Sequence, residues 1–241
     1  MEFFPLFLAA GAILGLIMVY RRAPRETFDR WLWMVMLVLA LSLAGSRAGF
    51  VLTHAFAYAS RPLEVFMPWL GGLSWVGAVA GGMLGIGLAA LILKMPLAAA
   101  ADLLIWLLPP LAVLIWLGCW VSGCAYGIAL PDGASAWWGI NTLDETGGIL
   151  LRIPLQPAAS LILLAFFFCM ELVNPTTLPP CCMTAIILSG FALIQFVASL
   201  VRADPVKVIH GLRMDAWASL ILLGFGFILL VWSCVSVRKP A

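Results

Sequence analysis

The stretch Trp116-Leu117-Gly118-Cys119-Trp120-Val121-Ser122-Gly123-Cys124-Ala125-Tyr126-Gly127 closes a long apolar run and opens the longest polar segment of the chain. It holds two cysteines and three glycines, where an ordinary membrane helix would continue with Leu, Ile and Val. Glycine has no Cβ and lets backbone or a ligand approach closely. We therefore interpret this stretch as a packed or substrate-lining turn at the end of a membrane span.

The composition around this stretch indicates an all-α, polytopic membrane protein. Hydrophobic residues make up 64% of the chain, charged residues 10%, and the mean hydropathy is +1.12. These values exclude an ordinary soluble domain. A net charge of +2 without a basic face argues against a nucleic-acid partner. The N-terminus lacks the basic region of a cleavable signal peptide, so we expect the first span to be retained.

Apolar runs long enough to cross about 30 Å of hydrocarbon recur along the chain. They predict seven transmembrane helices, at about 3–20, 31–56, 70–93, 98–118, 155–173, 181–201 and 216–236. The first connection carries four arginines between Arg21 and Arg30 and is expected in the cytoplasm. The N-terminus then lies outside and the C-terminus, with Arg238 and Lys239, in the cytoplasm.

The connection 202–215 departs from this rule, because it holds Arg202, Lys207, His210 and Arg213 although the count places it outside. Three explanations stay open. The span count is wrong by one, the charge bias is only statistical in so short a loop, or the cations attract an anionic lipid headgroup.

Arg47 lies deep in the second span, where an arginine costs at least about 2.5 kcal/mol on insertion scales unless it finds water, a partner or a ligand. Snorkelling is the structural alternative to a functional role. His54 follows seven positions later, about two helical turns, and would share a face with Arg47. The two side chains could line one polar cleft, with His54 as a candidate base.

The glycines of the third span, including Gly81, Gly82, Gly85 and Gly87, predict close helix packing in lipid. The segment 119–154 is predicted to be an outer-surface insertion of turns, and the whole chain, 1–241, to be one integral membrane domain. The six cysteines and two histidines form no zinc pattern, and neither a metal nor a cofactor is expected.

The order of several short motifs resembles the prolipoprotein diacylglyceryl transferase family, in its branch with Gly-Cys-x3-Gly-Cys. Its Gly-Ala-Arg-Leu-Gly is similar to 45–49, and its Gly-Gly-Leu-Ser-Phe-His-Gly to 71–77. Its Gly-Arg-Leu-Gly-Cys-Phe-x-x-Gly-Cys-Cys-Tyr-Gly is similar to 115–127, and its Pro-x-Gln to 154–156. Its Arg-Phe-x-x-Glu-Phe-x-Arg aligns with 195–202, and its last span resembles the segment that starts at Met214.

The resemblance implies transfer of diacylglyceryl from phosphatidylglycerol to the thiol of a lipobox cysteine, in the bacterial cytoplasmic membrane. The implied partners are phosphatidylglycerol and a prolipoprotein signal peptide. The implied lipid- or phosphate-binding residues are Arg47, Arg202, Gln156 and Gln195. The implied cleft lining is Gly71, Gly72, Ser74, Gly118, Cys119, Gly123, Tyr126 and Gly127. With the N-terminus outside, these residues are expected to converge on one outward-facing cleft.

The family's polar residues are replaced at four positions, by Val76, Trp116, Gln195 and Ser199. Valine cannot accept a proton, and tryptophan cannot balance a phosphate. Two hypotheses follow. One is a diverged transferase that uses Arg47, Arg202 and His54 in altered roles. The alternative is a non-catalytic, lipid-binding relative that acts as a subunit or scaffold of a membrane complex.

Cys119 and Cys124 are expected at the outer face, where a disulfide can form. The family branch also has cysteines at these positions, which favours packing residues over a bridge. Cys181 and Cys182 are expected near the inner face, as thiols.

Overall fold

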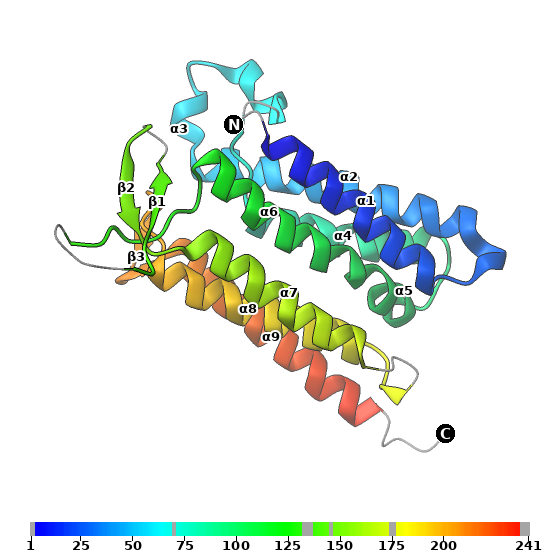
Figure 1. Cartoon of the computed structure of the whole chain (residues 1–241). Coiled ribbons are helices and arrows are strands. Elements are labelled where there is room, and N and C mark those ends of the chain that lie inside the picture. The colour runs from blue at the N-terminus through cyan, green and yellow to red at the C-terminus, as the bar shows by residue number, and fades with distance from the viewer. Residues whose placement is uncertain (1–2, 69–70, 132–136, 145–146, 174–176, 237–241) are drawn as a thin grey trace. The chain divides into compact units, whose positions relative to one another are not determined.

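In a computed structural model, which describes residues 3–68, 71–131, 137–144, 147–173 and 177–236, the chain is predominantly helical (Figure 1). Six helical stretches in these residues are long and apolar enough to cross a membrane. They are Phe4–Arg22, Asp29–Thr53, Trp75–Ile92, Leu97–Ser122, Cys182–Val201 and Met214–Val235, and Leu155–Glu171 is a shorter apolar helix. The expected all-α class with about seven apolar helices is confirmed.

The long helices are α1 (Phe4–Arg22), α2 (Phe28–Thr53), α4 (Trp75–Ile92), α6 (Leu108–Ser122), α7 (Leu155–Glu171), α8 (Cys182–Val201) and α9 (Met214–Ser236). The short ones are α3 (Ala55–Tyr58), α5 (Leu97–Leu104) and the 3-10 turns η1 (Arg25–Thr27), η2 (Pro62–Phe66) and η4 (Ile105–Leu107). Two hairpins pair β1 (Ile140–Leu143) with β2 (Ile149–Arg152) and β3 (Val208–Ile209) with β4 (Leu212–Arg213).

The predicted fourth span is interrupted, as its two prolines require. Leu97–Ser122 is one apolar stretch in which η4 separates α5 from α6. Pro109 and Pro110 stand in the first turn of α6. A proline there removes no intrahelical hydrogen bond, because the first N–H groups of a helix have no acceptor within it.

The chain forms two compact units. Unit 2 comprises Leu16–Leu104, and its core is the contact between α2 and α4. A Cβ on Gly77 would lie 2.1 Å from the Gly45 carbonyl oxygen, and one on Gly81 would lie 2.1 Å from that of Leu41. The two backbones touch, as small residues in membrane helices permit. This packing was predicted for Gly81 and Gly85. The prediction is wrong for Gly87, which faces open space.

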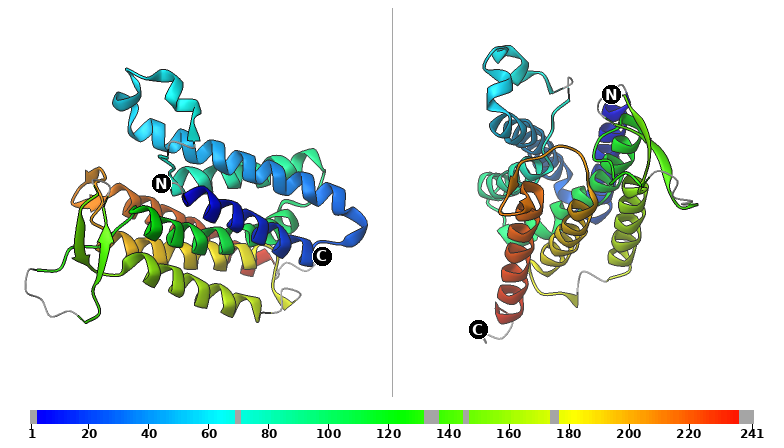
Figure 2. Two further views of the ribbon diagram at one scale, coloured as in Figure 1. Left: turned by 45° about the horizontal axis from the view of Figure 1, so that its top comes forward. Right: turned by 90° about the vertical axis from the view of Figure 1, so that its left-hand side faces the viewer.

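Unit 1 comprises Met1–Gly15 and Ile105–Ala241. The first part of α1 runs antiparallel to α6, with Phe4 and Phe7 against Gly118, and Leu111 against Gly11. Next, α7 contacts α6 and α8, and α8 contacts α9. Figure 2 shows both hairpins at the end of this unit where α6 and α8 finish and α7 and α9 begin.

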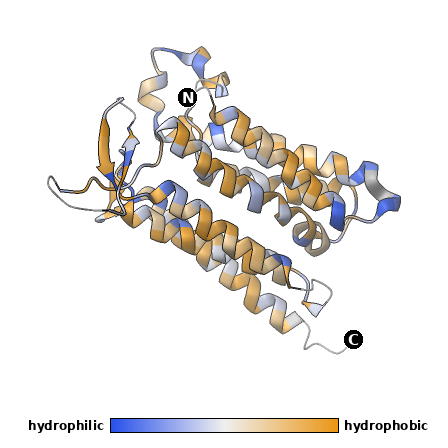
Figure 3. Ribbon diagram, viewed as in Figure 1, coloured by the Kyte–Doolittle hydropathy of each residue, from blue (hydrophilic) through white to orange (hydrophobic). Residues whose placement is uncertain are grey.

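Hydrophobic residues make up most of the long helices in both units, and hydrophilic residues gather at helix ends and in connections (Figure 3). Leu84, Leu161, Ile221 and Phe227 are each more than 60% exposed. Soluble proteins rarely leave such large contiguous apolar surface in water. These faces are the expected contact with lipid.

The α2–α4 contact predicts opposite effects for two Gly→Ala substitutions in one helix. Gly81→Ala forces the backbones apart and should cost about 1–3 kcal/mol, or roughly 2–12 °C in midpoint temperature. In Gly87→Ala the added Cβ has no neighbouring atom within 4 Å, so the substitution should stabilise the helix by about 0.5–1 kcal/mol. Thermal unfolding in detergent compares the two variants. Equal midpoints would contradict the close contact.

Candidate functional site

The segment 123–129 begins where α6 ends and contacts α7, α8 and β2 of unit 1. Gly123 caps α6 in the left-handed conformation, with φ 74°, which glycine adopts without strain. The Cys124 amide donates to the Cys119 carbonyl at 3.0 Å. Cys119 and Cys124 form a disulfide, with their Cα atoms 4.6 Å apart. The bridge corrects the expectation that these cysteines serve as packing residues: the turn at Gly123 brings the two Cα atoms within the range that a disulfide needs.

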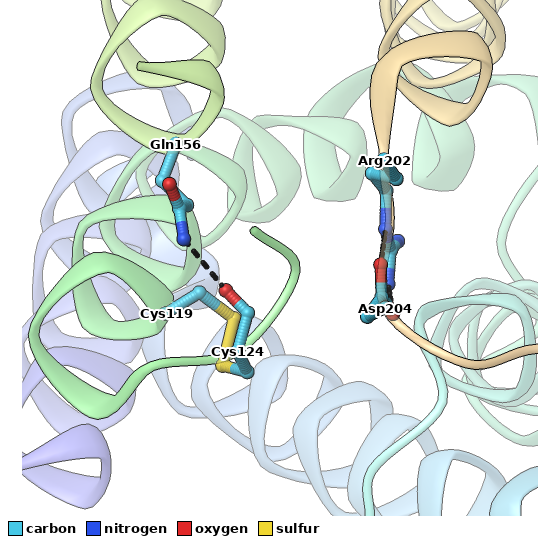
Figure 4. The surroundings of a disulfide bond; sticks show 5 residues. All are labelled: Cys119, Cys124, Gln156, Arg202 and Asp204. Carbon is cyan, nitrogen blue, oxygen red and sulfur yellow. Dashed lines mark hydrogen bonds and ion pairs between the residues drawn. A yellow bond between two sulfur atoms is a disulfide. The ribbon is translucent and has the colours of Figure 1, made fainter. Parts of the chain in front are cut away.

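Gln156, at the start of α7, is fully buried against this segment. Its Nε2 donates to the Cys124 carbonyl at 3.0 Å (Figure 4). Its Oε1 is buried and has no hydrogen-bond partner among the described residues. The nitrogen of the Gln156 side-chain amide therefore binds the disulfide loop, and the oxygen of the same amide remains available as an acceptor.

Arg152, at the end of β2, is the residue of this cluster that sequence reasoning missed. It is 5% exposed, its Nη1 donates to the Gly127 carbonyl at 3.3 Å, and its Nη2 pairs with Asp144 at 3.2 Å. The guanidinium carbon lies 4.3 Å from the centre of the Tyr126 ring. The segment 119–154, predicted to consist of turns, thus contains a hairpin that brings Asp144 and Arg152 together. β1 and β2 have four residues each, which is too short for an alternation of apolar and polar side chains to predict strands from sequence alone.

The other edge of the segment pairs with the end of α8. Ile128 donates to the Val201 carbonyl at 3.0 Å, and Ala203 donates to the Tyr126 carbonyl at 2.9 Å. Gly127 is bridged to Arg202, and a Cβ on Gly127 would lie 2.5 Å from the Ile153 carbonyl oxygen. Glycine is required there because three chain segments meet.

Arg202 is engaged by two carboxylates. Its Nε and Nη2 donate to the two Asp204 oxygens at 2.8 and 2.5 Å, and its Nη1 lies 3.3 Å from Asp215 Oδ2. Figure 4 shows the guanidinium and the Asp204 carboxylate facing each other. Arg213 joins the same group, 3.2 Å from Asp204 and 3.1 Å from Asp215. Two cations and two anions make a neutral, largely buried network.

This network changes how the loop 202–215 is interpreted. Asp204 and Asp215 pair with Arg202 and Arg213 within the same loop and reduce its excess of cations. Lys207, which is exposed, leaves three Lys and Arg side chains against two Asp, a net charge of +1. So small a charge in a short loop offers little basis for the positive-inside rule.

Arg47, in unit 2, is 7% exposed, and its hydrogen-bond acceptors among the described residues are all neutral. Nε donates to the Val65 carbonyl at 2.9 Å, and Nη1 donates to those of Gly71 at 2.5 Å and Gly72 at 3.1 Å. Nη2 donates to the Glu64 carbonyl. Arg47 thereby closes the loop between α2 and α4, and no carboxylate among the described residues balances its charge. The Glu64 carboxylate pairs with Arg61 instead.

The predicted cleft residues Gly71, Gly72 and Ser74 belong to the same loop. Gly71 and Gly72 have φ of 88° and 74°. A Cβ on Gly72 would lie 2.4 Å from the Phe50 ring and 3.0 Å from Arg47 Nη1. Ser74 caps α4 by accepting from the Gly77 amide at 3.3 Å. These residues form one cluster with Arg47.

His54 makes no hydrogen bond or ring contact with Arg47 among the described residues, so the polar cleft shared by the two side chains stays a prediction. Helix α2 ends at Thr53, one residue before His54. The exposed His54 ring stacks on Phe50 at 4.2 Å, and its Nδ1 lies 3.0 Å from the Phe50 carbonyl oxygen. Arg47 instead lies 5.2 Å from the centre of the Tyr58 ring.

The four positions where the sequence departs from the transferase motifs offer no substitute base or cation. Trp116 and Gln195 are buried in α6 and α8, and Val76 is 38% exposed at the start of α4. The Ser199 hydroxyl donates to the Phe196 carbonyl at 2.6 Å. Among the described residues, no group of three His, Cys, Asp or Glu side chains is arranged to hold a metal.

Comparison with known proteins places this arrangement in a family. The model of the family described as prolipoprotein diacylglyceryl transferase matches residues 1–232. A phosphatidylglycerol–prolipoprotein diacylglyceryl transferase of Paraburkholderia xenovorans (strain LB400) is 27% identical, over 82% of this chain and 75% of its own length. Proteins of that name from Burkholderia mallei (strain SAVP1) and Burkholderia pseudomallei (strain 668) are also 27% identical, over 78% of this chain and 73% of their own length.

The match extends over nearly the whole chain, and it agrees with the run of apolar helices that the structure shows. The protein is therefore an integral membrane protein, and its chain belongs to the prolipoprotein diacylglyceryl transferase family.

Proposed function

We propose that this protein is a phospholipid-binding member of the family that does not catalyse diacylglyceryl transfer. The observation that carries the proposal is the engagement of the two arginines that the family motifs retain. Arg202 is bound by Asp204 and Asp215, and Arg47 by four backbone carbonyl groups. The Arg202 charge is therefore neutralised within the protein, and of the two retained arginines only Arg47 keeps a charge that could meet a phosphate.

Transfer from phosphatidylglycerol needs groups that this site lacks. A cysteine thiol must lose its proton, attack the glycerol carbon to form a thioether, and release a glycerol phosphate anion. A base near the thiol and cations near the phosphate would lower that barrier. The family's histidine and signature arginine are Val76 and Trp116 here. His54 stacks on its own helix end and is no replacement.

Arg47 supports the lipid-binding part of the proposal. A buried cation is costly beside apolar helices unless an anion or strong dipoles meet it. Here carbonyl dipoles meet it, while its net charge stays unbalanced among the described side chains. A headgroup phosphate of an anionic phospholipid supplies the missing charge. In unit 1, the free Oε1 of Gln156 suits a hydroxyl donor such as headgroup glycerol.

The remaining sequence-based assignments belong to the same proposal. The Arg47 cluster in unit 2 and the segment 123–129 in unit 1, with Gln156 and Gln195, are each proposed to contact lipid of the outer leaflet. The protein lies in the bacterial cytoplasmic membrane with its N-terminus outside, and it acts as a subunit or scaffold that binds another membrane protein or a prolipoprotein signal peptide.

A diverged transferase is the second candidate, and Arg47 favours it too. Its unbalanced charge is what a departing phosphate requires. In that reading the Asp204–Arg202 pair opens when substrate enters. The two candidates share the lipid and differ only in whether the thioether forms.

A transfer assay separates the two candidates. Purified protein is incubated with phosphatidylglycerol and a lipobox peptide, beside a transferase that retains the histidine and signature arginine as positive control. We expect no mass increase of the peptide by a diacylglyceryl group. Modification that persists in this protein but disappears in Arg47→Met would establish the transferase.

Lipid preference tests the role of the Arg47 charge. Phosphatidylglycerol should raise the midpoint temperature by about 2–4 °C more than phosphatidylethanolamine, corresponding to about 1 kcal/mol. Arg47→Lys keeps the charge but loses most carbonyl contacts, so it should lower the midpoint in both lipids and retain the preference. Arg47→Met should abolish the preference. Arg61→Gln, at a side chain that is 71% exposed, is the control. A preference unchanged in Arg47→Met would refute anion binding here.

A further inference from the structure

The six cysteines of this chain form two groups, one at each end of the helices of unit 1. The disulfide pair lies where α6 ends, beside Gln156 at the start of α7. The four thiols lie at the other helix ends. Cys169 is near the end of α7, Cys181 and Cys182 are at the start of α8, and Cys234 is near the end of α9.

The two groups are separated by about the thickness of a bilayer core. Asp215, in the first turn of α9, binds Arg202 and so lies at the disulfide end. Cys234 follows on the same helix, roughly 28 Å away at 1.5 Å per residue. Helix α8 runs antiparallel to α9, with Gly226 packed on Ser189, and α7 runs antiparallel to α8, with Gly190 packed on Phe166. The thiols of Cys169, Cys181 and Cys182 therefore lie near the level of Cys234.

Membranes separate compartments that oxidise and reduce thiols. A disulfide at one end of the helices and four thiols at the other match an oxidising and a reducing side of the membrane. This argument for the orientation of the chain does not use the arginines. We infer that the Cys119–Cys124 bond is installed on the extracytoplasmic side by a thiol oxidoreductase carrying a reactive disulfide, and that the four thiols face the reducing cytoplasm.

The chemistry balances without another reactant. The Cys119 and Cys124 thiols lose two protons and two electrons, and one S–S bond forms between them. The donor's disulfide takes up the two electrons and two protons and becomes a dithiol. A mixed disulfide between one of the two cysteines and the donor is the intermediate.

The bond restrains the segment on which unit 1 depends. It closes the turn through Gly123 and fixes the Cys124 carbonyl to which Gln156 donates. Four and five residues after Cys124, Ile128 and Ala129 pair with α8 and β2. Besides the bond, the Cys124–Cys119 amide hydrogen bond and the Gln156 contact hold this end of the segment. Oxidation is therefore a step in building the site, whether or not the protein binds lipid.

Two-stage thiol labelling in spheroplasts tests the inference on the unmodified protein. A charged, membrane-impermeant maleimide is applied with or without an impermeant phosphine, and a second maleimide is added after denaturation. Peptide mass spectrometry should find the first label on Cys119 and Cys124 only after phosphine. The four other cysteines should carry the second label in both samples.

Two results would overturn the inference. One is labelling of Cys119 and Cys124 by the first maleimide without phosphine, which would mean that they are thiols in the cell. The other is a first label on Cys169 or Cys234, which would mean that the free cysteines face outside. Neither outcome depends on lipid binding, so failure here is distinct from failure of the proposed function.

A matched pair of variants tests what the bond restrains. In hydrogen exchange, Cys124→Ser should accelerate the amides of Ile128 and Leu130 by roughly tenfold or more. Cys169→Ser should leave them unchanged. Equal exchange in both variants would show that the segment is held without the bond.

Discussion

A guanidinium group buried beside apolar helices must be met by acceptors, and the polar parts of this protein are arranged around that requirement. Insertion of an arginine at mid-membrane depth costs about 2.5–3.5 kcal/mol even on permissive scales. Arg47 takes four loop carbonyls, Arg152 takes Asp144 and the Gly127 carbonyl, and Arg202 takes Asp204 and Asp215. The loop conformations follow from these contacts, because each arginine joins segments distant in sequence.

The same contacts are the basis for the proposal that family membership and activity separate. The backbone features that the family motifs encode are kept, including the glycine turn at Gly123 and the close α2–α4 contact around Gly77. The two retained arginines differ in their partners. The Arg202 charge is neutralised by two aspartates, whereas the Arg47 guanidinium is bound by backbone carbonyl dipoles. A site of this kind suits recognition of an anionic lipid better than stabilisation of a charge that develops during reaction.

Sequence patterns predicted the helices well and the charge pairing poorly, for physical reasons. Hydropathy reports the length of an apolar run, so all seven helices were found within a few residues of their ends. Pairing depends on loop geometry. Asp204 is two residues from Arg202, so the two side chains share a face only because the chain becomes extended at Arg202, and Asp144 meets Arg152 only because a hairpin forms. The exposed His54 ring stacks on Phe50, a contact between neighbouring turns that the sequence did not indicate.

The central claim is that the retained arginines serve the protein's own loops and that lipid is recognised at Arg47 without being consumed. An electron cryomicroscopy structure in nanodiscs of phosphatidylglycerol tests this claim directly. The account predicts intact lipid with its phosphate near Arg47, while Arg202 remains bound to Asp204 and Asp215. A phosphate seated on Arg202, with Asp204 displaced, would contradict it and point to a working transferase.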